Sequence, residues 1–225
     1  MSVAMSSRLT VVLLALMLGI QPVSSDLYLP TLPILTQEFG ASMAQAHMTL
    51  SALLLAFGIS QLFWGPLSDM WGRRPVLLLG LMAYVIAGVG CVIAPSIDAL
   101  ILWRTLQGAA MGSVVVCARA IVRDLYTPDI GARVMSKALT GLGAIACMSA
   151  PLGAFITQTY SWYAALGAVS AFGAICLFAI AWKYQETAPN TGSVIPPMKE
   201  LASRDRKSTR LNSSHSSVSR MPSSA

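Results

Sequence analysis

Two ionisable residues, Asp26 and Arg104, lie inside stretches of sequence that are otherwise almost entirely apolar. A charge in a membrane segment is costly unless it faces a polar cavity, so a functional role is the default interpretation. A carboxylate in surroundings of low dielectric can bind and release a proton near neutral pH. The sequence therefore makes Asp26 a candidate proton carrier, with the alternative that it only caps a short helix over Leu27–Thr31.

Arg104 begins an Arg-x-x-Gln-Gly pattern with Gln107 and Gly108 near the start of its apolar stretch. We expect this arginine to lie near Asp26 or near a substrate, where its charge would modulate the proton affinity of the carboxylate. The alternative is an arginine whose side chain snorkels to the outer headgroups. Four further polar or soft side chains are candidate substrate contacts: Tyr28, Gln61, Gln107 and Met148.

A third group of charges lies in the stretch Gly65–Pro75, which contains Asp69, Gly72, Arg73 and Arg74. Apolar segments flank this stretch on both sides, so we expect a short loop between two membrane helices. Gly65 and Gly72 would allow a tight turn and a close approach of helices. The alternative is an ordinary basic membrane loop that only sets topology.

The segments that must position these residues are long enough to cross a bilayer, which takes about 20 residues each. Hydrophobic residues make up 55% of the chain and charged residues only 11%, against about 25% charged in soluble domains. The sequence predicts an all-α integral membrane protein with six spans: Leu9–Pro33, His47–Leu67, Val76–Ala94, Ala99–Ile121, Val134–Thr157 and Ser161–Trp182. A cleaved signal peptide over Met1–Ser25, which would leave five spans, is the alternative for the first of these.

Basic residues are concentrated in every second connection between these segments. The first, third and fifth connections, around Glu38, Asp98 and Tyr160, contain no lysine or arginine, whereas the second and fourth are basic. Excess positive charge marks cytoplasmic loops, so this pattern predicts that both ends of the six-span domain are cytoplasmic. The net charge of +6 therefore reflects membrane topology, and we expect a lipid bilayer and no nucleic acid as a partner.

The sequence divides into three parts. Residues 1–184 form the predicted transmembrane domain, and residues 185–204 are polar and proline-containing, as expected of the start of a cytoplasmic loop. Residues 205–225 differ in kind: Asp205–His215 matches the in-frame translation of a widely used sequencing adapter, and Ser219–Ala225 resembles its continuation. We expect this tail to be non-native, with a genuine serine-rich tail as the alternative.

The Gly65–Pro75 stretch resembles the loop between helices 2 and 3 of the major facilitator superfamily, with Gly65, Asp69, Gly72 and either Arg73 or Arg74 at matching positions. It departs from that pattern at Met70, where a basic residue is usual. Four other stretches resemble the Bcr/CflA-type drug resistance branch of that superfamily: Asp26–Pro30 with Leu32-Pro33, Phe57–Leu62, Ala118–Tyr126 and Ala150–Ala154.

This resemblance implies a function and roles for several residues. It implies drug:proton antiport by alternating access across the bacterial inner membrane, with drugs such as chloramphenicol or bicyclomycin-like compounds as substrates and the proton gradient as the energy source. Asp69, Arg73 and Asp124, with Gly65 and Gly72, would form a cytoplasmic latch, weakened by Met70. Pro151 and Gly153 would belong to an antiporter-type motif of the fifth span. The chain would be the N-terminal half of a 12-helix fold, whose C-terminal six-helix half is missing.

Other classes of function find little support in the residues. The four cysteines, Cys91, Cys117, Cys147 and Cys176, fall one each in four different spans, so neither a metal site nor a disulfide framework is indicated. We expect no cofactor and no enzymatic activity, because His47, the one histidine before the tail, has no catalytic partner nearby in sequence and no phosphate-binding loop is present. Two alternatives stay open: a truncated, non-functional fragment, and a nutrient symporter of the same superfamily.

Overall fold

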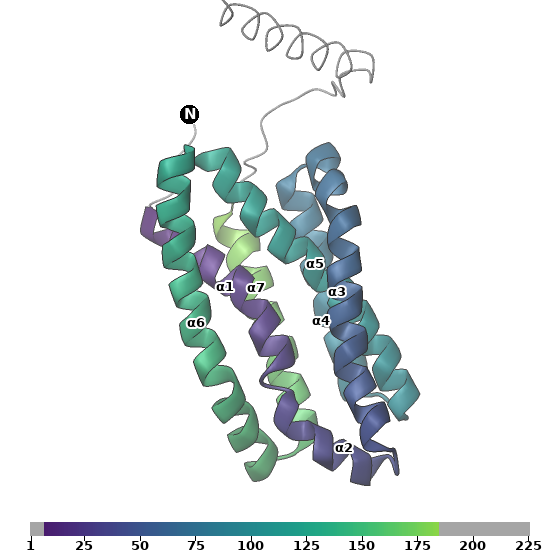
Figure 1. Cartoon of the computed structure of the whole chain (residues 1–225). Helices are drawn as coiled ribbons and strands as arrows, with labels where there is room; N and C mark the ends of the chain where they lie inside the picture. Colours follow the sequence, from purple (N-terminus) through teal and green to yellow (C-terminus); the bar gives the residue numbers. More distant parts are fainter. Residues whose placement is uncertain (1–6, 185–225) are drawn as a thin grey trace, which may run out of the picture. The chain divides into compact units, whose positions relative to one another are not determined.

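The computed structural model describes residues 7–184, which form helices joined by short connections (Figure 1). In chain order these are α1 (Ser7–Ser25), the 3-10 helix η1 (Leu29–Thr31), α2 (Leu32–Glu38), α3 (Met43–Trp71), α4 (Arg73–Val92), α5 (Ile97–Leu125), α6 (Pro128–Thr159) and α7 (Trp162–Lys183).

Six helical segments are long and apolar enough to cross a membrane, the first of them, Leu9–Glu38, being assembled from α1, η1 and α2. The prediction of an all-helical membrane fold with six spans is confirmed. All six lie in one unit, Met1–Pro189. The segments predicted as a cytoplasmic loop (185–204) and as a non-native tail (205–225) lie outside the described residues.

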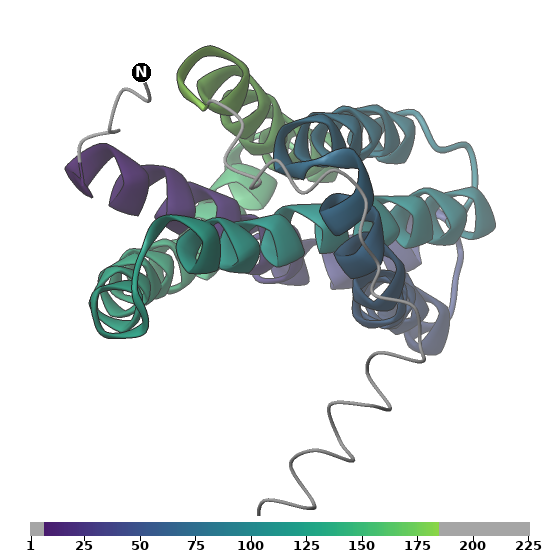
Figure 2. The ribbon, with the colours of Figure 1, turned by 90° about the horizontal axis from the view of Figure 1, so that it is seen from above.

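Helix α5 runs through the middle of the six-span unit and is its most buried span (Figure 2). Both α3 and α4 pack along it, while α1 packs mainly on α6 and α7 mainly on α4. The main apolar cluster joins residues of α1, α4, α5 and α7. By contrast, α3 and α6 are the least buried spans and carry many exposed large apolar side chains.

Close packing of α3 on α5 depends on two glycines of α5. A Cβ atom on Gly108 would overlap the carbonyl oxygen of Leu53, and one on Gly112 would overlap the side chain of Ser60. Small residues spaced four apart let the backbones of membrane helices approach closely. The Gly108-x-x-x-Gly112 pattern is therefore a packing feature.

Helices α3, α5 and α6 extend beyond the predicted spans at both ends, whereas α7 keeps its predicted length and α4 ends two residues early. Helix α3 begins at Met43, before the predicted His47, because Ser42 and Gln45 form a reciprocal capping box: the Gln45 N–H donates to Ser42 Oγ (3.2 Å) and the Ser42 N–H to Gln45 Oε1 (2.9 Å). Ser96 and Ser161 cap α5 and α7 more simply: the serine Oγ accepts a hydrogen bond from the backbone N–H three residues on, with no bond in return from the alanine at that position. The caps of α3 and α5 start these helices before the predicted His47 and Ala99.

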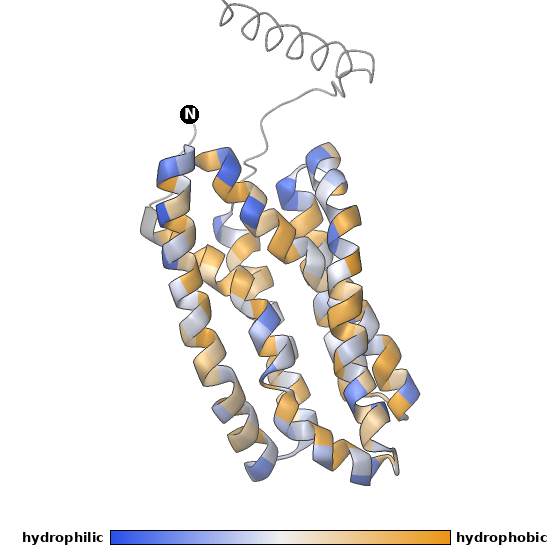
Figure 3. Ribbon diagram, in the orientation of Figure 1, coloured by the Kyte–Doolittle hydropathy of each residue, from blue (hydrophilic) through white to orange (hydrophobic). Residues whose placement is uncertain are grey.

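Hydrophilic residues, drawn in blue, concentrate at the ends of the bundle, and several of them gather where α3 meets α4 and where α5 meets α6 (Figure 3). The middle of each span is mostly apolar or weakly polar. Charged groups can therefore stay hydrated while the apolar middle of each helix lies in the bilayer.

Candidate functional site

The first span is interrupted where α1 ends at Ser25 and η1 begins at Leu29. Asp26 lies in this break and is half-buried. Its carboxylate accepts a hydrogen bond from Ser25 Oγ (2.7 Å), while its backbone N–H donates to the Pro22 carbonyl (2.7 Å). The break therefore places a carboxylate beside the end of a helix within a membrane span.

A capping role for Asp26 is not what the structure shows. The N-cap positions of η1 and α2 are Tyr28 and Thr31, and neither helix start has a side-chain cap hydrogen bond. Among the described residues, the hydrogen-bond partner of the Asp26 carboxylate is the adjacent Ser25.

Arg104, on α5, is fully buried and points at the same break. Its Nη1 donates to the carbonyl oxygen of Ser24 (3.1 Å) and to Oε1 of Gln107 (3.2 Å). Its guanidinium carbon lies 3.6 Å from the centroid of the Tyr28 ring. The alternative of an arginine that snorkels to the headgroups is therefore wrong, because the side chain is held inside the bundle by α1 and by its own helix.

The charge of Arg104 is not matched by a carboxylate within residues 7–184. Its Nε and Nη2 atoms are buried without a hydrogen-bond partner there. The Ser24 carbonyl belongs to the C-terminal turn of α1, whose partial negative charge favours a cation, and the Tyr28 ring adds a cation–π contact. Arg104 thus contacts the residue two positions before Asp26 but does not pair with the Asp26 carboxylate. Two donor nitrogens, Nε and Nη2, stay available within residues 7–184 for an anionic or carbonyl oxygen.

Two tyrosines hold the break in place, and the sequence analysis missed one of them. Ser24 Oγ lies 2.6 Å from the Ile20 carbonyl oxygen and 2.6 Å from the Tyr84 hydroxyl. Because the one proton of Ser24 is donated to the Ile20 carbonyl, Tyr84 must donate its proton to Ser24. Thr49 Oγ1 likewise donates to the Ala46 carbonyl (2.6 Å), so Tyr28 donates to Thr49 (2.6 Å).

Tyr84 could have been suspected from sequence as an isolated tyrosine in an apolar span, because a buried tyrosine hydroxyl usually finds a partner. Its partner, Ser24, could not have been identified in that way, because the two residues come from different spans.

The predicted helix motif of the fifth span lies on α6. A Cβ atom on Gly153 would overlap the backbone carbonyl of Leu27, so this glycine packs directly against the break that holds Asp26. Pro151 is exposed, and α6 stays helical through it. The sequence analysis singled out both residues, but only Gly153 contacts the break.

The four candidate substrate contacts fall in different places. Tyr28 and Gln107 belong to the buried cluster around Arg104. Gln61 is half-buried and its Nε2 donates weakly to the Phe57 carbonyl of its own helix (3.4 Å). Met148 is 55% exposed on α6.

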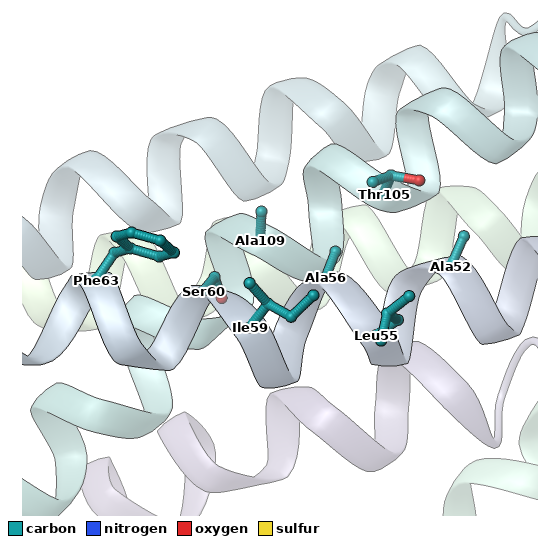
Figure 4. A pocket seen from close by; sticks show the side chains of 8 residues that line it. All are labelled: Ala52, Leu55, Ala56, Ile59, Ser60, Phe63, Thr105 and Ala109. Carbon is teal, nitrogen blue, oxygen red and sulfur yellow. The ribbon is translucent and has the colours of Figure 1, made fainter.

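A groove of about 410 Å³ lies between α3 and α5, and its lining is almost entirely apolar (Figure 4). Leu55, Ile59 and Phe63 come from α3, and Thr105 and Ala109 from α5. None of the four candidate contacts lines it.

The three charged residues of the predicted latch, Asp69, Arg73 and Asp124, do come together, around a buried Arg73. Its Nη1 lies 2.5 Å from Asp69 Oδ1 and its Nε 2.9 Å from Asp124 Oδ2. Ser68 Oγ accepts a further hydrogen bond from Nη1 (2.8 Å). Arg123 joins at longer range, 3.7 Å from Asp69 and 3.9 Å from Asp124. The cluster thus ties the end of α3 and the start of α4 to the end of α5.

The local structure of the latch differs from the prediction. Gly65 and Asp69 lie within α3, which continues through Pro66 to Trp71, so the expected loop shrinks to the single residue Gly72. Gly72 has φ 93°, a conformation that favours glycine. Among residues 7–184, no atom lies within 4 Å of a Cβ position built on Gly65, so no helix described here packs closely against it.

Arg74 is not a purely solvated charge, because its Nη2 donates to the Ala181 carbonyl near the end of α7 (3.2 Å). Cys91, Cys147 and Cys176 are free thiols. Within residues 7–184 no cluster of three or more His, Cys, Asp or Glu side chains could hold a metal ion.

Comparison with known proteins identifies the family. Residues 14–217 match the family model of the Major Facilitator Superfamily, a range that extends past Arg204 into the predicted tail. Relatives include the multidrug resistance protein MdtL of Klebsiella pneumoniae (33% identical, covering 85% of this chain and 48% of the relative). They also include a chloramphenicol resistance protein of Pseudomonas aeruginosa (34% identical, 71% and 38%).

Solved structures agree with this assignment at the level of the fold. The proton:xylose symporter XylE superposes with a TM-score of 0.70 at 14% identity, covering 80% of this chain and 45% of XylE. The human organic anion transporter MFSD10 gives a TM-score of 0.62 at 24% identity, covering 82% and 49%. The chain therefore spans about half the length of the relatives it matches. With six membrane-length helices in this arrangement and a family match over most of its length, the chain belongs to the major facilitator superfamily.

Proposed function

We propose that this chain is part of a Bcr/CflA-type transporter that exports small amphipathic drugs, such as chloramphenicol or bicyclomycin-like compounds, in exchange for protons. The observation that carries the proposal is the similarity to relatives named for multidrug and chloramphenicol resistance over most of this chain. In this proposal the site described above would bind and release the proton.

In this proposal Asp26 carries the proton. Its carboxylate lies at a break in a membrane span, half-buried and bonded only to a neighbouring hydroxyl within residues 7–184. Arg104 holds the preceding turn of α1, and its Nε and Nη2 have no hydrogen-bond partner within residues 7–184. Deprotonation would draw the Asp26 carboxylate toward this charge, and protonation would release it, which makes the break sensitive to proton binding.

The cluster around Arg73 would act as the latch of one access state. Three charged residues from α3, α4 and α5 meet there, so a movement of any of these helices must disturb an ion pair. Gly153, packed on Leu27, would couple α6 to the break beside Asp26. The basic residues at the start of α4 and at the end of α5 favour a cytoplasmic position for this end of the bundle, in the bacterial inner membrane.

A second six-helix half completes this proposal. The relatives are about twice the length that the chain covers, and inter-half sites are the rule in this architecture. The same observation favours the second candidate, that the chain alone is a non-functional fragment. A nutrient symporter is the less favoured alternative, since XylE shares only the fold at 14% identity.

The test is a resistance assay in an efflux-deficient bacterium. It compares this chain with the reading frame extended into its genomic continuation, each as wild type, Asp26→Asn and Asp98→Asn. Asp98 is an exposed acid in the first turn of α5, so its substitution is the matched control for charge. We expect resistance to chloramphenicol-like drugs from the extended form, lost with Asp26→Asn and retained with Asp98→Asn.

Other outcomes separate the candidates. Resistance from the short chain would exclude the fragment. No resistance from either form would contradict drug export. Resistance that survives Asp26→Asn and a protonophore would contradict proton coupling.

A further inference from the structure

Tyr84 lies in the middle of the apolar helix α4, and its side chain is fully buried. Its hydroxyl lies 2.6 Å from Ser24 Oγ, on α1. A hydroxyl buried in apolar surroundings costs free energy unless it forms a hydrogen bond. What a tyrosine adds to a phenylalanine at this position is therefore its bond to Ser24.

Three glycines fix the place from which Tyr84 reaches α1. Gly80 and Gly88 lie four residues before and four residues after Tyr84, and a Cβ atom on either would overlap a serine side chain, of α5 and of α7 respectively. A Cβ atom on Gly173 of α7 would overlap the Tyr84 ring itself. Small residues at such contacts let membrane helices approach closely. The hydroxyl is therefore positioned by α4, α5 and α7 together.

Ser24 is held from two helices, because its side chain and its main chain have different partners. Its Oγ accepts the hydrogen bond from Tyr84 of α4, and its carbonyl oxygen accepts one from Nη1 of Arg104 of α5 (3.1 Å). Tyr84 thus restrains the same residue whose carbonyl group Arg104 binds. Loss of the tyrosine hydroxyl would leave the last turn of α1 held by Arg104 on one side only.

The restraint on Ser24 reaches Asp26 through a short connection. Asp26 follows Ser24 by two residues, and the residue between them, Ser25, donates a hydrogen bond to the Asp26 carboxylate (2.7 Å). The carboxylate is half-buried in this position. A change in the last turn of α1 must therefore change how far the Asp26 carboxylate is exposed.

Arg104 is the charged group that contacts this turn, and the other helices bring neutral groups to it. α4 brings Tyr84, α6 brings Gly153 against Leu27, and α3 brings Thr49 to the Tyr28 hydroxyl. Two thiols lie near Tyr84, those of Cys91 and Cys176. The charged residues of α4, α6 and α7 lie at the far ends of these helices: Arg73, Arg74, Asp129, Arg133, Lys137 and Lys183. Three titratable residues at the near end of the bundle are exposed: Glu38, His47 and Asp98.

We propose that Tyr84 is a positioning residue for proton binding at Asp26 and that it acts through Ser24. Its hydroxyl stays a donor to Ser24 throughout, and it keeps the last turn of α1 in the place where the Asp26 carboxyl is half-buried near Arg104. This role rests on the proton-carrying function proposed for Asp26. It also connects α4 and α7 to the break in α1, since both helices fix the tyrosine ring.

The first experiment measures how accessible Asp26 is in the full 225-residue chain. The purified protein in detergent is treated with a water-soluble carbodiimide and glycinamide, and the labelled carboxyl groups are identified by peptide mass spectrometry. The variants are Tyr84→Phe, Ser24→Ala and the two combined. Tyr163→Phe is the matched control, because it removes the same hydroxyl from a side chain that is 44% exposed.

Two other carboxyl groups of the same chain serve as internal references. Asp98 is exposed and reports on the reagent, whereas the Asp124 side chain is 7% exposed and reports on general loosening of the bundle. In Tyr84→Phe we expect labelling of Asp26 to rise by about fivefold, the change in population that corresponds to about 1 kcal/mol for one hydrogen bond. Labelling of Asp98 and Asp124 should not change, and neither should any labelling in Tyr163→Phe.

The combined variant tests whether the two residues act through one bond. Because Tyr84→Phe and Ser24→Ala break the same contact, the combined variant should label no faster than the faster single variant. Unchanged labelling of Asp26 in Tyr84→Phe would overturn the proposal. An equal rise at Asp124, or additive effects in the combined variant, would also overturn it.

The second experiment measures drug export as a function of pH by the reading frame extended into its genomic continuation. The pH of half-maximal export should move in Tyr84→Phe and stay as in wild type in Tyr163→Phe, whereas loss of stability alone would lower export equally at every pH. A pH profile unchanged in Tyr84→Phe would contradict the positioning role. Absence of export from the extended form would contradict the proposed function, and the labelling of Asp26 would then decide whether Tyr84 positions this carboxyl.

Discussion

The ion-pair cluster around Arg73 makes a quantitative prediction, because its two carboxylates differ in burial. The side chain of Arg73 is 4% exposed and that of Asp124 is 7% exposed, whereas that of Asp69 is 59% exposed. Breaking a buried pair leaves an uncompensated charge and costs about 3 kcal/mol or more, while an exposed pair is worth about 0 to 1 kcal/mol. Asp124→Asn should therefore destabilise the chain by about 3 kcal/mol, and Asp69→Asn by less than about 1 kcal/mol.

The destabilisation predicted for Asp124→Asn is taken from the lower end of the range for breaking a buried ion pair, because Arg73 retains Ser68 and Asp69 as partners. A change of that size alters the folding equilibrium by about a hundredfold. The assay is equilibrium unfolding in mixed micelles of increasing SDS fraction, followed by circular dichroism.

A double-mutant cycle with Arg73→Gln separates the pair from its surroundings. We expect Arg73→Gln with Asp124→Asn to cost less than the sum of the two single changes, because neither charge is then left alone. Equal costs for Asp69→Asn and Asp124→Asn, or strict additivity in the cycle, would refute the reasoning from burial.

Three further predictions concern packing and polar contacts, each measured by the same unfolding assay. Gly153→Ala should destabilise the chain by about 1 to 3 kcal/mol through its clash with the Leu27 carbonyl in the break. Gly143→Ala on the same helix, with open space around it among the described residues, should be neutral or stabilising by up to about 1 kcal/mol. The reverse order would contradict the packing. Tyr84→Phe should cost about 1 kcal/mol, because Ser24 loses its donor, and no change would mean that this bond is replaced by another. Arg74→Gln should cost about 0.5 to 1 kcal/mol by freeing the last turn of α7, and a loss of helix content rather than of stability would show a different role.

The sequence predicts the number and order of the spans because six apolar blocks are separated by short polar stretches. It predicts the ends of the spans less well. Pro66 and Asp69 are residues typical of a loop, yet α3 continues through both to Trp71. The reason is tertiary: Arg73, Ser68 and Asp124 satisfy the polar groups at this end, and that set is assembled from three helices.

The candidate site shows the same division between local and long-range information. Asp26 and Arg104 stand out in sequence as charges within apolar stretches, and Asp69, Arg73 and Asp124 come from a recognisable pattern. The contact of Arg104 with the Ser24 carbonyl rather than with a carboxylate depends on where α1 breaks, which no periodicity indicates. Hydropathy alone likewise cannot show that Gly65 faces open space.

The single-residue joint at Gly72 has a mechanical consequence. Successive Cα atoms are separated by about 3.8 Å, so α3 and α4 have no slack between them and cannot slide past one another along their axes. Any tilt of α3 must instead pivot at Gly72, within one residue of the guanidinium that holds both carboxylates. Gly72 would therefore act as a hinge, and the ion pairs of Arg73 lie directly beside it. Even a small rotation between the two helices would change the geometry of these ion pairs before it changed any more distant contact.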